Sequence, residues 1–280
     1  MKFTKMQGLG NDYVYLDCTG EMPGDLPGLT RKISDRHFGV GSDGLICVCP
    51  SRRADFRMVM YNADGSEGEM CGNGIRCVGK FVYEKGLSGK CHLAIETLAG
   101  IKMLELHTSG GTVVSVTVDM GEPILAPERI PVIASGDNFI AQHMEAGGRT
   151  WEVTCLSMGN PHAVIFVPAV SSLPLRELGP LFERHPSFPH RINTEFVQVE
   201  DKSTLRMRVW ERGSGETLAC GTGACASLVA AVLNGLSEPK ATVRLLGGDL
   251  IIRWDRETDG HVYMTGPAVT VFEGDWPCGN

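Results

Sequence analysis

The sequence lacks the features that mark several large classes of protein. No apolar run approaches the roughly 20 residues of a membrane-spanning helix, and the opening MKFTKMQGLGNDY has no continuous apolar segment of the signal-peptide kind. No block of Lys and Arg suits a phosphate backbone, and the net charge is −7. No two cysteines have the C-x2-C spacing common in structural zinc sites. We therefore expect a cytoplasmic protein with no nucleic-acid, membrane or metal partner.

Two of the ten cysteines stand in similar short motifs, MCGNGIRC around Cys71 and ACGTGACA around Cys220. They are 149 positions apart, and the same offset relates Asn11 to Asn160 and Asn62 to Glu211. At this offset DFRMVMYNADGSEGEMCGNG aligns without a gap on TLRMRVWERGSGETLACGTG. The 280 residues therefore contain two similar halves, long enough to fold without disulfide bonds.

Each half has the same predicted order of elements. FRMVMY and LRMRVW alternate as half-buried strands do, and a polar turn leads from each to its cysteine. Helices are predicted over 72–85 and 221–234, with Gly86 and Gly235 as stop signals. We predict an α+β fold of two pseudo-symmetric domains, each an antiparallel β-barrel-like sheet wrapped around a central helix. The predicted domains are residues 1–119, completed by a last strand over about 265–280, and residues 120–264.

A cysteine at the start of a helix is well placed for acid–base chemistry. The first N–H groups of a helix lack intrahelical partners and carry the positive end of the dipole, so the pKa of a thiol there can fall from about 8.5 to about 3.5–7.5. The Gly-x-Gly after each cysteine would let a carboxylate approach those N–H groups. If the halves face each other, one thiolate could remove a proton from a carbon acid while the other thiol protonates the opposite face. That operation inverts a stereocentre without metal or pyridoxal phosphate.

Two other interpretations fit the same cysteines. A redox protein could form a Cys71–Cys220 disulfide reversibly, and a binding module could hold an amino acid without chemistry. Thiol titration before and after mild peroxide tests the first interpretation. Exchange of the α-hydrogen of the bound amino acid tests the second.

Together, the motifs resemble the diaminopimelate epimerase family of pyridoxal-independent amino-acid epimerases, over essentially the whole chain. The motifs are GNDY (10–13), NADGSEGEMCGNGIRC (62–77), GNPH (159–162), RINTEFV (191–197), ERGSGETLACGTG (211–223) and MTGPA (264–268). The resemblance implies two similar domains with one active site between them, a homodimer, and no cofactor. It also implies stereoinversion of LL-2,6-diaminopimelate to meso-diaminopimelate, a step in making lysine and peptidoglycan precursors.

The resemblance further implies roles for individual residues. Cys71 and Cys220 would transfer the protons. Hydrogen bonds to the carboxylate at the reacting carbon would come from Gly72, Asn73, Gly221 and Thr222. The distant end of the amino acid would be held by Asn11, Asn62, Asn160, Asn193, Glu211 and Arg212, because a second carboxylate and ammonium call for a guanidinium, amides and a carboxylate. His162 and Glu211 would tune the thiol pKa values. The alternatives are turn-forming asparagines, a core histidine and an exposed Glu211–Arg212 ion pair.

Two positions depart from the family pattern. Gly44 stands where many members have glutamine, and Phe272 where members often have a tyrosine at the dimer seam. The main alternative on this fold is a proline or hydroxyproline racemase, which shares the paired cysteines. Those enzymes typically have histidine after the first cysteine's glycine and Asp-x-Ser-Pro before the second cysteine. Asn73 and Glu211-Arg212-Gly213 stand there instead, which favours the diaminopimelate epimerase interpretation.

Overall fold

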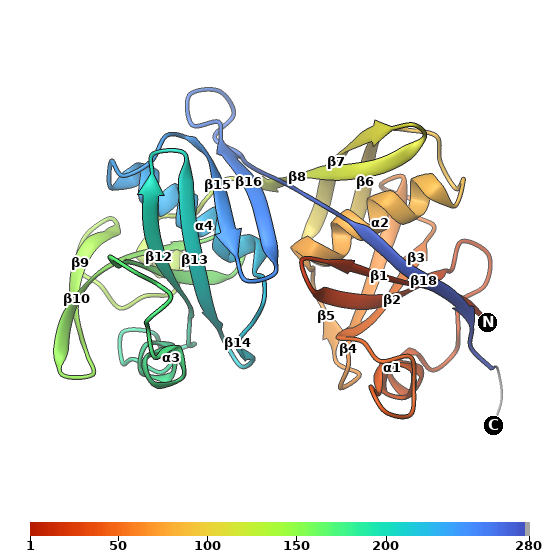
Figure 1. Cartoon of the computed structure of the whole chain (residues 1–280), viewed down its shortest axis with the longest axis horizontal. Helices are drawn as coiled ribbons and strands as arrows, with labels where there is room; N and C mark the ends of the chain where they lie inside the picture. The colour runs from red at the N-terminus through yellow and green to blue at the C-terminus, as the bar shows by residue number, and fades with distance from the viewer. Residues whose placement is uncertain (278–280) are drawn as a thin grey trace. The chain divides into compact units, whose positions relative to one another are not determined.

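The computed structural model describes residues 1–277, in two compact units (Figure 1). The first unit is Met1–Val118 together with the chain from Thr265 onward, and the second is Asp119–Met264. The last strand of the chain, β18 (Val269–Asp275), pairs with the first, β1 (Lys2–Gly8), so the C-terminal segment completes the N-terminal unit. Residues 278–280, which the predicted last segment included, lie outside the described part of the chain.

The first unit is a sheet with two helices. Its strands pair in the order β18-β1-β2-β3-β4-β6-β7-β8, with a short β5 added to β4. The elements between β1 and β18 are β2 (Asn11–Asp17), α1 (Leu26–Ser34), β3 (Gly44–Cys49), β4 (Phe56–Asn62), β5 (Glu67–Gly68), α2 (Gly72–Glu84), β6 (His92–Thr97), β7 (Gly100–Ser109) and β8 (Thr112–Gly121).

The second unit repeats this arrangement. Its strands pair in the order β9-β10-β11-β12-β13-β15-β16, with a short β14 added to β13. The elements are η1 (Pro127–Arg129), β9 (Phe139–Ala146), β10 (Arg149–Ser157), β11 (Pro161–Phe166), α3 (Leu175–Glu183), β12 (Asn193–Asp201), β13 (Thr204–Glu211), β14 (Gly215–Glu216), α4 (Gly221–Leu233), β15 (Lys240–Leu245), β16 (Gly248–Trp254) and β17 (Val262–Gly266).

Most strand pairs are antiparallel, but each unit also contains two parallel pairs that the sequence did not reveal. They are β2–β3 and β4–β6 in the first unit, and β11–β12 and β13–β15 in the second. Parallel neighbours need a long crossover connection, and the four helices lie in these four connections. The predicted α+β class, with a repeated sheet-and-helix unit, is confirmed.

The central helices α2 and α4 are largely buried. Burial covers Asn73 to Val82 in α2 and most of α4, whose sequence is apolar on nearly every face. Each helix stops close to the predicted boundary, and the glycine after it, Gly86 or Gly235, takes the positive φ of a C-terminal stop (70° and 69°). Within residues 1–277, no helix combines the length and apolar character needed to cross a bilayer.

Candidate active site

Both motif cysteines are the N-cap residues of the central helices. Cys71 (φ −130°, ψ 117°) precedes α2 and Cys220 (φ −123°, ψ 110°) precedes α4, each with the extended backbone usual at an N-cap. Each sulfur accepts a hydrogen bond from the third residue of its helix, from Gly74 N at 3.3 Å and from Gly223 N at 3.4 Å. Both thiols therefore lie at the positive end of a helix dipole, as predicted from the two motifs.

The second glycine of each motif is required by the strand beneath it. A Cβ on Gly74 would lie 2.8 Å from Ile46 Cδ1, and a Cβ on Gly223 would lie 2.6 Å from Glu195 Oε1. Ile46 and Glu195 stand 149 positions apart, so they are repeat-related, but one is apolar and the other is a carboxylic acid. The two thiols thus have similar backbone settings and different chemical surroundings.

The surroundings of Cys71 come from β2 and the turn before β3. Its thiol donates to Asn11 Oδ1 at 3.1 Å, and Asn11 Nδ2 donates to Asp43 Oδ2 at 2.8 Å. Tyr13 lies on the same strand and is 5 % exposed. Burial raises the pKa of the Tyr13 hydroxyl well above its ordinary value, and the negative charges of Cys71 and Asp43 act in the same direction. The structure therefore places Asn11 at the sulfur itself.

Gly44 and Tyr13 lie next to each other in the sheet. They are register partners on the parallel pair β2–β3. A Cβ on Gly44 would clash with the Tyr61 carbonyl oxygen and lie 2.8 Å from Tyr13 Cε1. No side chain fits at position 44 in this structure, because the Tyr61 carbonyl and the Tyr13 ring occupy the adjoining space.

The surroundings of Cys220 contain two carboxylates and an imidazole. His162 Nδ1 lies 2.7 Å from Glu195 Oε1, and both side chains are fully buried. His162 Nε2 lies 2.9 Å from Asn160 Oδ1. Glu211 is close enough to raise the pKa of the Cys220 thiol, and Thr217 Oγ1 donates to Glu211 Oε1. These side chains form an acid–base cluster beneath the first turn of α4.

The pKa of Cys220 moves in the direction opposite to the sequence-based expectation. Burial raises it well above the ordinary value of 9.0, and the charges of Glu211 and Glu195 raise it further. Hydrogen bonds from Thr222 and from Gly223 N lower it, but they do not outweigh burial. The prediction that this thiol ionises easily is wrong for this structure, because burial and two carboxylates outweigh the helix N-terminus. Burial likewise raises the pKa of Glu211.

Several other predicted residues make structural hydrogen bonds. Asn193 Nδ2 donates to Pro161 O at 3.0 Å, and its Oδ1 accepts from Arg212 N at 2.9 Å. Arg212 Nη1 donates to His190 O at 3.2 Å. Asn193 therefore links β11 and β12 to the turn that carries Arg212.

In the first unit, Asn62 Nδ2 donates to Ser66 Oγ at 3.0 Å, in the turn before Cys71. Asn73 Oδ1 accepts from Arg76 Nη2 at 3.1 Å, and both side chains are buried. The predicted residues thus divide between the two units, each of which contains one of the two cysteines. The first set is Asn11, Asn62, Cys71, Gly72 and Asn73; the second is Asn160, His162, Asn193, Glu211, Arg212, Cys220, Gly221 and Thr222.

Sequence reasoning missed Asp43, Tyr13 and Glu195. Glu195 could have been found, because it is a carboxylate within the motif RINTEFV and has apolar Ile46 as its repeat-related residue. Its Oε2 is buried and has no hydrogen-bond partner among residues 1–277. Asp43 and Tyr13 gave no comparable signal, because their importance depends on contacts with Asn11.

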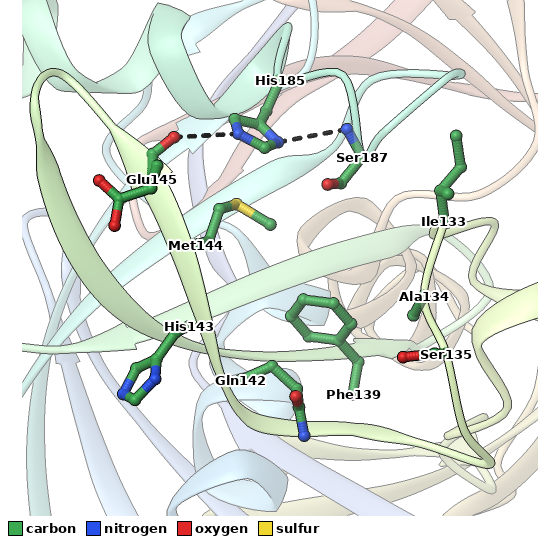
Figure 2. A pocket seen from close by; sticks show the side chains of 10 residues that line it. All are labelled: Ile133, Ala134, Ser135, Phe139, Gln142, His143, Met144, Glu145, His185 and Ser187. Carbon is green, nitrogen blue, oxygen red and sulfur yellow. Dashed lines mark hydrogen bonds between the residues drawn. The ribbon is translucent and has the colours of Figure 1, made fainter.

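A cavity of about 360 Å³ in the second unit lies away from all predicted site residues. Its lining includes Ile133, Phe139, His143, Glu145 and His185 (Figure 2). Ser187 N donates to His185 Nδ1 at 3.2 Å, so the ring proton is on Nε2, which contacts Glu145 O at 3.1 Å. His185 is held by backbone groups on both sides, as a structural histidine is.

Comparison with known proteins agrees with the motifs. The family model described as diaminopimelate epimerase matches residues 3–126 and 154–271. The chain is 61 % identical to the diaminopimelate epimerase of Acetivibrio thermocellus, over 98 % of each chain. It is 58 % identical to that of Methanococcus maripaludis, over 98 % of this chain and 99 % of the other. A crystal structure of a probable proline racemase from Agrobacterium radiobacter matches with a TM-score of 0.72 at 15 % identity, covering 99 % of this chain and 92 % of that one. This last likeness shows the fold alone.

Proposed function

Because the chain belongs to the diaminopimelate epimerase family, we propose that it interconverts LL- and meso-2,6-diaminopimelate through acid–base chemistry of Cys71 and Cys220. The observation that carries the proposal is the pair of N-capping thiols, each at the start of a central helix and each followed by Gly-x-Gly. The product would serve the synthesis of lysine and peptidoglycan precursors.

The proposed reaction uses two bases. One cysteine, as thiolate, takes the proton from the α-carbon, and the electron pair of the broken C–H bond moves into the adjacent carboxylate. The other cysteine, as thiol, donates its proton to the opposite face of the same carbon. The stereocentre is inverted, and the two sulfurs have exchanged protonation states. The first N–H groups of a helix lack intrahelical partners and are suited to stabilise the extra negative charge on the carboxylate.

The proposal also assigns the recognition of the non-reacting end. Arg212 is a guanidinium on a turn fixed by Asn193 and suits the second carboxylate. Asn62, Asn160 and Glu211 offer the amide and carboxylate groups that suit the second ammonium. Asn11 is now better explained by its contact with Cys71, so we propose that it serves the reacting end.

Heavy water provides the direct test. Incubation of the purified protein with LL-diaminopimelate in heavy water should produce meso-diaminopimelate with deuterium at the inverted carbon. Cys71→Ala and Cys220→Ala should each abolish the inversion, because each face of the carbon needs its own proton carrier. Cys77→Ala and Cys225→Ala are matched controls, because these thiols lie inside α2 and α4 and not at their starts. Near-normal turnover in Cys220→Ala, or a preference for proline over diaminopimelate, would refute the proposal.

We also propose a homodimer in which β18 takes part. Val269, Val271 and Phe272 on this strand are 42 %, 54 % and 46 % exposed. Phe272 meets Phe3 edge-on, with ring centroids 5.9 Å apart, and so extends the core of the first unit to the surface. Phe272→Asp should shift the molar mass measured by light scattering from dimer to monomer. An unchanged mass would remove β18 from the interface.

A further inference from the structure

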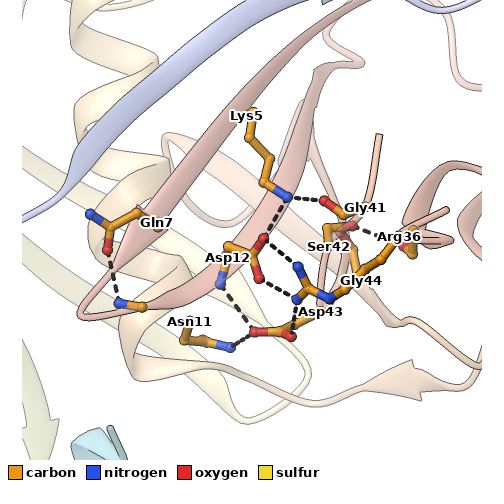
Figure 3. A network of polar contacts seen from close by, with 11 residues as sticks. Lys5, Gln7, Asn11, Asp12, Arg36, Gly41, Ser42, Asp43 and Gly44 are labelled. Atoms are coloured by element: carbon orange, nitrogen blue, oxygen red, sulfur yellow. Dashed lines mark hydrogen bonds and ion pairs between the residues drawn. The ribbon is translucent and has the colours of Figure 1, made fainter. Parts of the chain in front are cut away.

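A network of charged side chains in the first unit ends at the Asn11 side chain (Figure 3). Arg36 Nη2 donates to Asp12 Oδ1 at 2.7 Å and to Asp43 Oδ1 at 2.9 Å. Lys5, which is buried, pairs with Asp12 Oδ2 at 2.5 Å. Burial by itself would raise the pKa of Asp12, but hydrogen bonds from Arg36 and Lys5 outweigh it and lower the pKa. The network therefore alternates cations and carboxylates from Lys5 through Asp12 and Arg36 to Asp43, which contacts Asn11.

The Asp43 carboxylate is the acceptor in its contacts with Arg36, Asp12 and Asn11. Oδ1 accepts from Arg36, and Oδ2 accepts from Asp12 N at 3.1 Å and from Asn11 Nδ2 at 2.8 Å. A carboxylate held by a guanidinium has no proton to donate. The Asn11 amide must therefore turn its NH2 group toward Asp43, because the reverse orientation would bring two acceptor oxygens together.

The orientation of the Asn11 amide decides which group meets the sulfur of Cys71. With Nδ2 bound to Asp43, Oδ1 faces the other way and accepts the S–H of Cys71 at 3.1 Å. We propose that Asp43 is a positioning residue for Cys71, which fixes the Asn11 amide so that its oxygen, and not its nitrogen, meets the thiol. The proposal rests on the proposed function only in treating Cys71 as a proton carrier.

The oxygen of Asn11, fixed in this orientation, influences whether Cys71 is a thiol or a thiolate. An acceptor at the sulfur stabilises the thiol, whereas the N–H of Gly74, 3.3 Å away on the other side, stabilises the thiolate. A reversed Asn11 amide would add a second donor and favour the thiolate. Asp43 therefore holds Cys71 in a balance between its two protonation states, which a residue that must both donate and accept a proton requires.

The network is specific to the first unit. The residue 149 positions after Asp43 is Ile192, so the second unit has no carboxylate there. The asparagine related to Asn11 is Asn160, whose Oδ1 faces His162 Nε2 at 2.9 Å. The Asn11 amide thus contacts a carboxylate through its nitrogen and a thiol through its oxygen, whereas the oxygen of Asn160 contacts an imidazole. The repeat alone does not account for Asp43, which supports a role particular to Cys71.

The test is the pH dependence of Cys71 alkylation by iodoacetamide, followed by mass spectrometry of the Cys71 peptide. Asp43→Ala should lower the midpoint by about 0.5–1 pH unit, the equivalent of one hydrogen bond, because Asn11 can then turn its NH2 to the sulfur. The groups around Cys71 include Tyr13, Tyr15, Cys77 and Gly74 N, and all four are unchanged in this variant. Asp55→Ala is the matched control, because Asp55 also binds a backbone N–H and a cation but does not contact Asn11. Its midpoint should equal that of the parent.

A double variant separates positioning from a direct effect of charge. Loss of the Asp43 charge would also lower the midpoint if it acted on Cys71 through space. In an Asn11→Ala background, however, Asp43→Ala should cause no further shift, because the amide that transmits the effect is absent. A shift of the same size in both backgrounds would overturn the proposal. If Asp43→Ala does not fold, Asp43→Asn replaces it in both backgrounds, because an amide at position 43 can donate or accept and no longer enforces one orientation.

The alkylation results and the epimerase assay can fail independently. If the parent does not epimerise diaminopimelate but the Asn11-dependent shift is found, the positioning role stands and the proposed function does not. If epimerisation is found and Asp43→Ala leaves the midpoint unchanged, the positioning role is wrong and the proposed function stands.

Discussion

Replacing His162 by leucine should destabilise the second unit strongly, because the buried Glu195 carboxyl would lose the imidazole that it hydrogen-bonds. The pair has an Nδ1–Oε1 distance of 2.7 Å, and both side chains are completely buried. The second oxygen of Glu195 already lacks a partner among residues 1–277, so no neighbouring donor in that range compensates for the loss.

The size of the loss follows from the geometry. Removing one member of a buried pair costs about 3–5 kcal/mol in measured cases, since the remaining charge stays desolvated. We therefore expect His162→Leu to lower the free energy of unfolding by about 3–5 kcal/mol at neutral pH.

The double variant His162→Leu/Glu195→Ile should recover most of this loss. Replacement of a buried ion pair by apolar residues is often neutral or stabilising, and Ile46 shows that isoleucine fits beneath a first helical turn in the repeat-related position. Double and single variants together give the coupling energy of the pair.

Urea unfolding followed by tryptophan fluorescence suits the measurement. Three of the four tryptophans, Trp151, Trp210 and Trp254, belong to the second unit. The reasoning is refuted if His162→Leu lies within about 1 kcal/mol of the parent, which would mean that Glu195 tolerates burial without the imidazole. A double variant less stable than His162→Leu would also contradict it.

Three further predictions concern the Cys220 site and the substrate. Burial, and then the charges of Glu211 and Glu195, raise the pKa of Cys220, so iodoacetamide should label this thiol only at pH values well above 9.0. The contribution of the protonated thiol to the free energy of unfolding should be complete below pH 9.0 and should be lost as the pH rises toward the raised pKa. Urea unfolding at several pH values can show this loss. Gly223→Ala should reduce both stability, by about 1–3 kcal/mol, and epimerase turnover, because its methyl would meet Glu195 Oε1; a fully active variant would contradict the packing. Arg212→Lys should lower kcat/KM for diaminopimelate about 10- to 100-fold through loss of the guanidinium fork, whereas unchanged kinetics would remove Arg212 from the substrate site.

Local patterns were enough to predict the elements that carry the cysteines. The starts and ends of α2 and α4 were readable because glycine stop signals and N-cap positions act over a few residues. The parallel pairs β2–β3 and β11–β12 were not readable, because strand partners across a helical crossover leave no mark on either strand alone. The repeated order of elements still followed from the 149-residue offset, since related sequences fold alike.

The sequence by itself determined that two N-capping thiols, related by an internal repeat, are present in a chain of the diaminopimelate epimerase type. Spacing and helix signals specify such features locally. Only the tertiary structure decided how the two thiols differ. Asn11 contacts the Cys71 sulfur and is itself held by Asp43, whereas Glu195 and His162 lie beneath the helix of Cys220. Helix position alone predicted an easily ionised thiol, but the proton affinity of a buried group depends on desolvation and on charges brought near it from distant parts of the chain, which only folding establishes.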